Sequence, residues 1–246
     1  MGCVFCASGQ AGLVRGLTAA EIVAEVLIAR RYLEPGEQLR NLVFMGMGEP
    51  LHHYDETARA LRLLSHPDGA AIGLRRITVS TVGLVPGIRR LGEDFAGKVG
   101  LAVSLHAPND DVRGRIVPMN RRYPLRELIA ALRAYPLPRR RRITIEYTLI
   151  AGVNDAPEHA RELVVLLRNL PVKLNLIPMN PVKNSDFAAP ALERVEAFRE
   201  RLAGAGLSCF VRTRRGDAVD AACGQLAMNP ELVTLRRSPG LSAKQE

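Results

Sequence analysis

The sequence predicts an α/β protein built on a parallel sheet, arranged either as a (β/α) barrel or as an open doubly wound sheet. Extended and helical patterns alternate strictly along the chain, and the connections between them are short. Strands that alternate with helices pair in parallel through right-handed crossovers. With 246 residues and an apolar share of 47%, the chain is long enough to bury one large core. We therefore expect a single domain.

The first helix is predicted from a capping box. Thr18 is followed three residues later by Glu21, a spacing that satisfies the free N–H groups at a helix start. Apolar residues then recur at helical spacing as far as Leu33, and Pro35 and Gly36 end the helix. The predicted apolar face comprises Ile22, Val26, Ala29 and Leu33.

Three strands and two helical segments follow in the first half of the chain. Apolar and β-branched runs predict strands at residues 41–46, 76–81 and 98–105. Helical periodicity predicts a helix over residues 55–64 and a short helical turn over residues 86–91.

Prolines mark the helix starts of the second half. Pro124 and Pro157 lie where first-turn prolines open helices, and these helices are expected to end near Tyr135 and Asn169. Continuous apolar runs between and after them are typical of buried strands. The remaining elements are strands at 142–149 and 172–177, a helix over 190–204 and a last strand at 207–212. Residues after Pro230 lack apolar periodicity, so we expect a frayed tail.

Cysteine content and hydropathy predict a cytoplasmic protein. The chain has four cysteines and no charged-then-apolar leader, which favours a reducing compartment. No apolar run is long enough to span a membrane. The start Met1-Gly2-Cys3 resembles a myristoylation site only superficially, because Cys6 stands where Ser or Thr is required.

The charge balance has two explanations of equal weight, a polyanionic partner and a bias in base composition. The net charge is +9, and only four of the 34 basic residues are lysines. Arginine suits phosphate and base edges, but a genome rich in arginine codons explains the surplus equally well. The four arginines at 139–142 are ambiguous in the same way, because they precede an apolar strand and fit a solvated strand entry.

Polar residues that follow four of the predicted strands indicate where the chemistry lies. Residues 46–50, 80–81, 104–106 and 178–181 all come at the carboxyl ends of strands. In parallel barrels the loops at this end converge and form the active site. No dinucleotide-binding glycine motif or phosphate-loop lysine follows any strand, which argues against a nucleotide-dependent enzyme.

Cys3 and Cys6 form the sharpest motif. Two cysteines separated by two residues present thiolates to one metal centre, but a chelate needs three or four ligands. Only Cys209 and Cys223 remain, and both lie far downstream.

The chain resembles the radical S-adenosylmethionine methyltransferases of the RlmN family. The resemblance covers nearly the whole chain, and its most specific part is the cysteine segment after Arg-Gly-Asp. The matching segments are residues 1–10 (MGCVFCASGQ), 17–19 (LTA), 45–51 (MGMGEPL), 79–81 (VST), 104–107 (SLHA), 177–181 (IPMNP), 215–217 (RGD) and 221–226 (AACGQL). The implied fold is a partial (β/α) barrel of the radical S-adenosylmethionine type with its first strand missing.

The resemblance also implies cofactors and site residues. Cys3 and Cys6 match two of three ligands of a 4Fe-4S cluster, which leaves one iron free to bind S-adenosylmethionine. The positions that match the family's S-adenosylmethionine contacts are Gly48, Glu49, Ser80, Ser104, Leu105, His106 and Asn180.

Cys223 is expected, on the same resemblance, to be the catalytic residue. It would receive a methyl group on sulfur and deliver it to carbon 2 of an adenine in 23S rRNA, and in tRNA. A flavodoxin-type system is the expected electron donor. Cys209 has no family match and is predicted to be a core thiol on a strand.

The sequence departs from the family at its start. The family's first cluster cysteine, its resolving cysteine, its first strand and its amino-terminal RNA-binding domain would all lie before Met1. We expect Met1 to be an internal methionine of a longer protein, with a cysteine two codons upstream. Residues 1–230 are then the radical S-adenosylmethionine core, and residues 231–246 the tail.

Three alternatives remain open on the sequence alone. The first is methylation of adenine carbon 8 by the same chemistry. The second is a catalytically dead RNA-binding remnant, because two thiolates hold a cluster incompletely. The third is an ordinary barrel enzyme with a two-cysteine zinc site.

Overall fold

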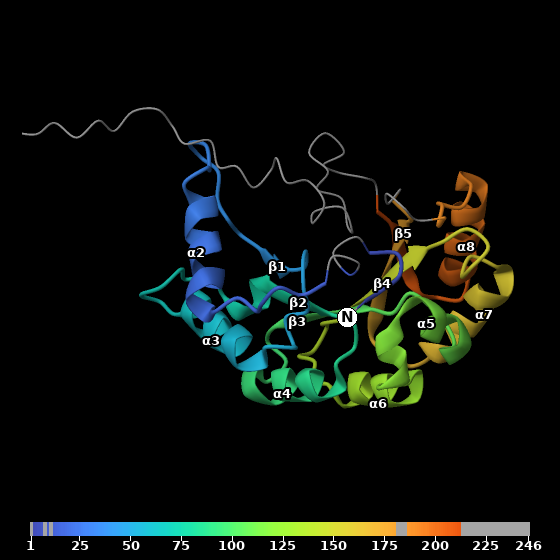
Figure 1. Ribbon diagram of the computed structural model, residues 1–246, viewed down its shortest axis with the longest axis horizontal. Helices are drawn as coiled ribbons and strands as arrows, with labels where there is room; N and C mark the ends of the chain where they lie inside the picture. The colour runs from blue at the N-terminus through green and yellow to red at the C-terminus, as the bar shows by residue number, and fades with distance from the viewer. Residues whose placement is uncertain (1, 7–8, 10–11, 181–185, 213–246) are drawn as a thin grey trace, which may run out of the picture.

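A six-stranded, fully parallel sheet forms the centre of the molecule (Figure 1). The structure is a computed structural model that describes residues 2–6, 9, 12–180 and 186–212. Neighbouring strands follow one another in chain order from β1 to β6, and β1 is not paired with β6. The predicted partial barrel is therefore confirmed. The strands are β1 (Leu42–Phe44), β2 (Ile77–Thr81), β3 (Gly100–Ser104), β4 (Ile143–Leu149), β5 (Val172–Pro178) and β6 (Ser208–Val211).

Helices form an arc around the outer side of this sheet (Figure 1). This arrangement follows from the right-handed crossovers that join parallel strands, because each crossover helix packs back onto the same face. The helices are α2 (Ala19–Arg30), α3 (Tyr54–Ser65), α4 (Val85–Phe95), α5 (Asp110–Ile116), α6 (Leu125–Ala134), α7 (Pro157–Leu166) and α8 (Leu192–Gly204). Two 3₁₀ turns, η1 (Leu74–Arg76) and η2 (Pro118–Arg121), complete the described elements.

The two faces of the sheet differ in polarity, as β4 illustrates. Ile145 and Tyr147 belong to the main apolar core beneath the helices. Glu146 and Thr148 alternate with them and therefore point to the inner, concave face of the sheet. Burial of each large apolar side chain on the helix side contributes about 1.5–3 kcal/mol. In β4 the concave face therefore carries polar side chains, which suits a binding site inside a partial barrel.

Helix α2 begins at the predicted residue, but fewer of its apolar side chains are buried than the sequence predicts. The Thr18 hydroxyl accepts from the Glu21 N–H at 3.3 Å, and the Glu21 carboxylate accepts from the Thr18 N–H at 2.9 Å, which confirms the capping box. The helix ends at Arg30, several residues before the predicted end at Pro35. Within it only Ala19 is fully buried, and Ala29 of the predicted apolar face is exposed. Apolar periodicity does not distinguish a covered helix face from an exposed one.

One helix is longer than the sequence predicts, and another helix is not predicted at all. Helix α4 extends to Phe95 and not only to residue 91, because Ile88, Leu91 and Phe95 continue one buried face. Helix α5 was not predicted, since its seven residues are too few to show a period. The one available signal is Asn109, whose side chain accepts from the Val112 N–H at 2.9 Å and caps the helix.

The other predicted elements are confirmed within a few residues of their bounds. Strand β1 is the largest deviation, with three residues where six were expected. No helix among the described residues is long and apolar enough to cross a bilayer. The predicted tail lies outside the described residues, and the assignment of residues 1–230 to one core stays a prediction.

Candidate functional site

The predicted site residues that the structure describes come together at one edge of the sheet. We call this edge the carboxyl rim, meaning the edge at which β1 to β6 end. Because all six strands are parallel, loops that follow different strands meet there. The residues at or directly after the strand ends are Gly48, Glu49, Ser80, Ser104, Leu105, His106 and Asn180.

Glu49 is held in place by backbone donors from two strands' loops. One carboxylate oxygen accepts from the Val82 N–H at 2.7 Å, and the other accepts from the Leu51 N–H at 3.1 Å. Gly48, directly before it, has a φ of +83°, a conformation that glycine adopts without strain. Burial raises the pKa of Glu49, while the two backbone bonds oppose that rise. The carboxylate is thereby fixed between the ends of β1 and β2.

The two predicted serines point into the concave face, but Leu105 does not. Ser80 in β2 and Ser104 at the end of β3 alternate with core residues and face the inside of the sheet. Leu105 is fully buried in the main core, and its N–H donates to the Glu146 carbonyl at 3.0 Å. A role of Leu105 at the site would therefore have to come from its backbone.

His106 is a buried, neutral imidazole in an unusual backbone conformation. Its φ is +60°, and its Nδ1 accepts from the Thr148 N–H at 3.0 Å. An Nδ1 that accepts must be unprotonated, so the ring proton of the neutral form lies on Nε2. Burial, and to a smaller extent the nearby Arg113 charge, lower the pKa of His106 to about 3. His106 thus offers one N–H donor and carries no charge at neutral pH.

This burial predicts a pH-dependent loss of stability. An unfolded histidine takes up a proton near pH 6.5, whereas folded His106 does so only near pH 3. Between these values the unfolded state binds more protons, so stability falls as the pH falls. From pH 7 to pH 5 the loss is about 2 kcal/mol. Urea unfolding at both pH values should show this loss in the wild type and not in His106→Asn, which tolerates positive φ. Equal losses in both proteins would contradict this assignment.

Asn154 supports His106 and was not predicted from the sequence. Its side chain is completely buried, and its amide donates to the His106 and Thr148 carbonyls at 2.7 and 2.6 Å. Its side-chain oxygen accepts from the Ile150 N–H at 2.7 Å. One amide therefore joins the loops that follow β3 and β4. In the sequence this residue stands between a Gly-Val pair and an Asp, and it resembles an ordinary turn residue.

Arg113 on α5 is the second residue that sequence reasoning missed. Its guanidinium donates to the carbonyls of Val82 and Leu105 at 2.6 and 3.0 Å, and to the Asn120 side chain at 3.0 Å. Only 1% of its surface is exposed, and burial lowers its pKa to about 10. It therefore remains charged at neutral pH. Arg113 therefore connects the loop that follows β2 with the loop that follows β3.

The cysteine segment packs onto this supported part of the rim. The Cys6 N–H donates to the Cys3 carbonyl at 3.1 Å, which folds the segment into a turn. The Val4 N–H donates to the Ile116 carbonyl of α5 at 3.2 Å, and the Phe5 ring meets the His106 ring edge-on at 4.8 Å. Cys3, Val4 and Phe5 lie against a second apolar cluster around Val82, Val112, Ile116, Ile150 and Met179. The turn that carries the predicted ligands therefore contacts His106 through Phe5, and it contacts the helix that carries Arg113 through Val4.

The two thiols fit part of a metal-cluster site. Burial raises the pKa of Cys3 to about 11, with the Cys6 thiol as the second cause, and Arg113 opposes the rise. Two sulfurs held in one turn are suitable ligands for iron or zinc. Within the described ranges, no group of three or more His, Cys, Asp or Glu residues is placed to hold a metal ion. Cys3 and Cys6 could therefore hold a metal centre only together with further ligands.

A polar row crosses the concave face directly below the rim. The register places Ser104 beside Glu146 and Glu146 beside Asn175. Glu146 accepts from the Asn175 amide at 2.9 Å, and its other oxygen is buried without a hydrogen-bond partner among the described residues. The Arg212 guanidinium lies 4.0 Å from that oxygen, and burial raises the pKa of Glu146. This row therefore places polar side chains, including one carboxylate oxygen without a hydrogen-bond partner among the described residues, on the concave face.

The structure tests the prediction for one of the two remaining cysteines. Cys209 lies on β6 and packs against the main core, where burial raises its pKa to about 11. Its predicted character as a core thiol is confirmed. Cys223 lies outside the described residues, so its predicted role stays a prediction.

Comparisons with known proteins agree with this geometry. The family model described as the radical SAM superfamily matches residues 1–164. A protein from Sorangium cellulosum named dual-specificity RNA methyltransferase RlmN is 63% identical over 240 residues, which are 98% of this chain and 62% of that protein. A protein of the same name from Marinobacter nauticus is 48% identical, over 99% of this chain and 67% of its own length. The chain thus spans about two thirds of these relatives, or less.

A solved structure shows the same fold at high identity. A radical SAM methyltransferase from Sphaerobacter thermophilus matches with a TM-score of 0.87 and 52% identity, over 91% of this chain and 66% of that one. A domain of pyruvate-formate lyase-activating enzyme from Bacteroides vulgatus matches with a TM-score of 0.53 and 19% identity, over 71% of this chain, which is a likeness of fold alone. The chain therefore belongs to the radical SAM superfamily and, within it, to the RlmN family.

Proposed function

We propose that the protein is a radical S-adenosylmethionine RNA methyltransferase that methylates carbon 2 of an adenine in 23S rRNA and in tRNA. The observation that carries this proposal is the packing of the Cys3–Cys6 turn beside His106, on the rim that also holds Glu49, Ser80 and Ser104. The relatives named as RNA methyltransferases support the choice of RNA as substrate. We further propose that the protein acts in the cytoplasm and takes electrons from a flavodoxin-type donor.

Cys3 and Cys6 are proposed to hold two irons of a 4Fe-4S cluster. When bound, the cluster and S-adenosylmethionine together supply a carbon-centred radical. The protein's contribution is to fix both thiols in one turn and to shield them, since the turn lies against the apolar cluster of Val82, Ile116 and Met179. Exclusion of water protects a reactive species from side reactions.

The rim residues are proposed to bind the second cofactor by complementary hydrogen bonding. The Glu49 carboxylate, already oriented by two backbone N–H groups, retains acceptor capacity for an ammonium group. The Ser80 and Ser104 hydroxyls, the His106 Nε2–H and the Asn180 amide are suited to hydroxyl groups and a base. Gly48 and Leu105 would take part through their backbone.

Cys223 is proposed to carry the methyl group as a thioether to the RNA base. An aromatic adenine carbon is too weak a nucleophile to attack a sulfonium methyl, so the methyl carbon itself has to become the radical. The adenine must leave its stack to reach a rim inside a partial barrel, which favours loop or single-stranded RNA.

The test is chemical analysis of the RNA product. The complete gene is expressed in a strain that lacks the corresponding methyltransferase, and 23S rRNA is digested to nucleosides for mass spectrometry. We expect 2-methyladenosine with the wild-type gene, no such product with Cys223→Ala, and the product again with Cys209→Ala as the matched control. 8-Methyladenosine would identify the carbon-8 reaction instead.

Analysis of the anaerobically purified protein completes the test. Iron and sulfide with the characteristic absorbance are expected. RNA binding without iron would indicate an inactive remnant, and zinc without iron would indicate an ordinary barrel enzyme. Either result, together with an absent mark, would refute the proposal.

A further inference from the structure

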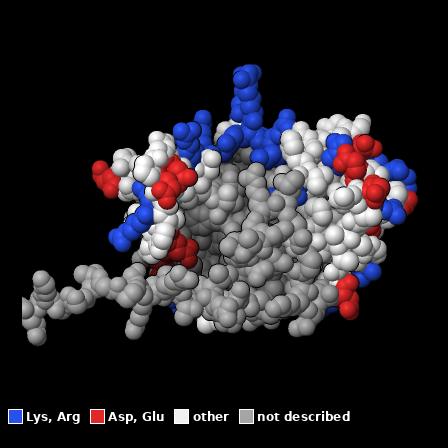
Figure 2. Space-filling view, turned by 90° about the horizontal axis from the view of Figure 1, so that it is seen from above, with Lys and Arg blue, Asp and Glu red and all other residues white. Residues whose placement is uncertain are grey.

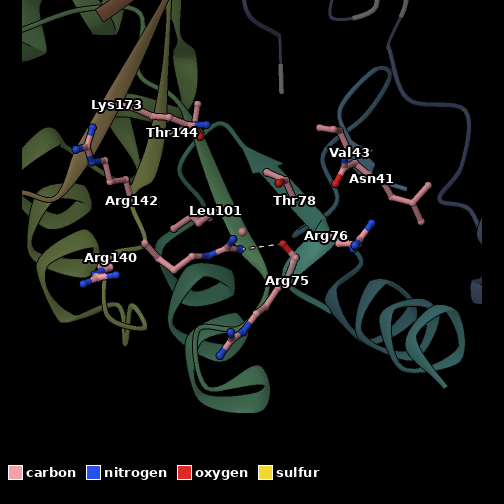
Figure 3. A pocket seen from close by; sticks show the side chains of 13 residues that line it. Asn41, Val43, Arg75, Arg76, Thr78, Leu101, Arg140, Arg142, Thr144 and Lys173 are labelled. Carbon is pink, nitrogen blue, oxygen red and sulfur yellow. Dashed lines mark hydrogen bonds between the residues drawn. The ribbon is translucent and has the colours of Figure 1, made fainter. Parts of the chain in front are cut away.

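A basic cavity lies at the end of the sheet opposite the carboxyl rim. Its volume is about 340 Å³, and it is lined by residues at the starts of β1 to β5 (Figure 3). We call its cations the basic cup, and they are Arg75, Arg76, Arg140, Arg141, Arg142 and Lys173. Asn41, Thr78 and Thr144 add polar side chains to the same lining. The proposed catalytic rim uses none of these residues.

The parallel sheet brings these cations together from separate parts of the chain. Arg76 directly precedes β2, Arg142 directly precedes β4, and Lys173 is the second residue of β5. Arg140 adopts a φ of +65° in a turn closed by the Arg141 N–H and the Pro138 carbonyl at 3.0 Å. Since parallel strands start at the same edge, three distant segments converge on one cavity.

Among the described residues, the one acidic side chain recorded as interacting with the basic cup is Glu146, where the Lys173 charge opposes the rise of its pKa. In the part of the chain that the structure describes, none of its six cations forms an ion pair. Two of them make neutral hydrogen bonds, from Arg141 to the Arg75 carbonyl at 3.1 Å and from Arg142 to the Ser208 hydroxyl at 2.6 Å. Several arginines on the helices differ in this respect. The helix arginines with ion pairs include Arg62, Arg90, Arg161 and Arg199.

The convergence of cations, and not the missing ion pairs, distinguishes the basic cup from an arginine-rich composition, because helix arginines such as Arg89 and Arg133 also form no ion pair among the described residues. A compositional surplus would raise the arginine content everywhere, but it does not explain why three distant segments place six cations around one cavity. Lys and Arg side chains gather along one edge in Figure 2, and the acidic side chains visible there lie toward the two ends of the molecule. Like charges held together repel one another, and a bound anion relieves that repulsion.

We propose that the basic cup binds the phosphodiester backbone of the RNA substrate, as a docking surface separate from the catalytic rim. This inference rests on the proposed function. Five strand starts spaced about 4.8 Å apart span about 19 Å, which suits several consecutive phosphates better than one small anion. Arginine forks and a lysine contact phosphates without reading sequence, so the cup would position the RNA and not select the adenine.

An acidic electron-donor protein fits this location less well. The Cys3–Cys6 turn lies at the other end of the strands, and the seven residues of β4 alone span about 23 Å. A donor seated on the cup would be far from the proposed cluster. A folded RNA is large enough to reach both ends of the sheet.

The test compares two triple variants with equal loss of charge in the full chain. The cup variant carries Arg75→Gln, Arg76→Gln and Arg140→Gln, whose exposed side chains form no hydrogen bond or ion pair with the described residues. The control carries Arg62→Gln, Arg90→Gln and Arg161→Gln on the helices. Binding to a transcribed 23S rRNA fragment is measured over a series of salt concentrations. Each phosphate contact contributes about 0.7–0.9 to the slope of log K against log salt, so the cup variant should lose about 2 from that slope.

The outcomes separate the inference from its alternatives. We expect at least a tenfold loss of RNA affinity at low salt in the cup variant, and a loss below threefold in the control. Equal slopes in the wild type and the cup variant would overturn the inference, as would loss of flavodoxin binding with unchanged RNA binding. Thermal unfolding should show that the cup variant is folded. If the triple variant is not folded, the single variant Arg140→Gln replaces it in the same measurement and should lower the slope by about 0.8.

Product formation distinguishes failure of the proposed methyltransferase function from failure of the proposed docking surface. At saturating RNA the cup variant should still form 2-methyladenosine, because its rim is intact. If neither protein forms the product while only the cup variant loses RNA affinity, the methyltransferase proposal fails and the docking surface stands.

Discussion

Arg113→Met is expected to lower the free energy of unfolding by about 3–5 kcal/mol. The guanidinium is 99% buried and satisfies the carbonyls of Val82 and Leu105 together with the Asn120 side chain. Methionine fills a similar volume but donates no hydrogen bond, so these acceptors would be buried without partners. Chemical denaturation of the wild type and the variant measures the loss directly.

The matched control for this variant is Arg133→Met. Arg133 is an exposed residue of α6, and the change should cost less than about 0.5 kcal/mol. Arg113→Lys should recover only part of the loss, because one ammonium cannot reach acceptors on three sides. A loss below 1 kcal/mol in Arg113→Met would mean that the rim does not depend on this side chain. In the holoenzyme, the same variant should also lower the iron content, since Val4 hydrogen-bonds to the helix that carries Arg113.

Asn154→Leu is expected to cost about 3–5 kcal/mol for a related reason. The side chain is completely buried and satisfies the His106 and Thr148 carbonyls and the Ile150 N–H. Leucine has nearly the same shape and leaves all three groups unpaired. The Tyr147 hydroxyl, which donates to the Asn154 carbonyl at 2.9 Å, is not altered directly. The measurement is again equilibrium denaturation, at pH 7.

The adjacent residue provides the control for this second variant. Asp155→Ala removes one solvent-exposed hydrogen bond, from the Gly152 N–H at 3.0 Å, at a half-buried residue. It should cost about 1 kcal/mol or less. Equal losses in Asn154→Leu and Asp155→Ala would refute the view that Asn154 holds the β3 and β4 loops together. Because His106 depends on Asn154 for its backbone position, S-adenosylmethionine affinity should fall in Asn154→Leu and stay unchanged in Asp155→Ala.

Both predictions concern side chains that bond to backbone carbonyls at strand ends. Loops that leave a sheet carry carbonyl groups without partners in the strand ladder, and these must be satisfied when they are buried. Arg113 does this between β2 and β3, and Asn154 does it between β3 and β4. These bonds connect the loops of the rim without a bound ligand, and a preorganised rim would suit the radical chemistry that we propose.

The two supporting residues of the site were not predicted from the sequence for the same reason. Arg113 lies in a seven-residue helix within a polar stretch, and Asn154 lies in a turn. In the sequence both have the appearance of surface residues, since arginine and asparagine are mostly exposed in proteins. Their burial depends on neighbours that are 31 and 48 residues away. No local pattern contains that information.

The sequence by itself determined the order of strands and helices, the parallel sheet and the rim at which Glu49, Ser80, Ser104 and His106 lie. It did so because apolar periodicity, capping residues and strand direction are local properties that parallel topology converts into positions. Only the tertiary structure decided that Leu105 faces the core, that Arg113 and Asn154 support the rim, and that six cations from three segments meet in the basic cup. The physical reason is that burial and charge pairing are set by residues distant in the chain, which packing alone brings into contact.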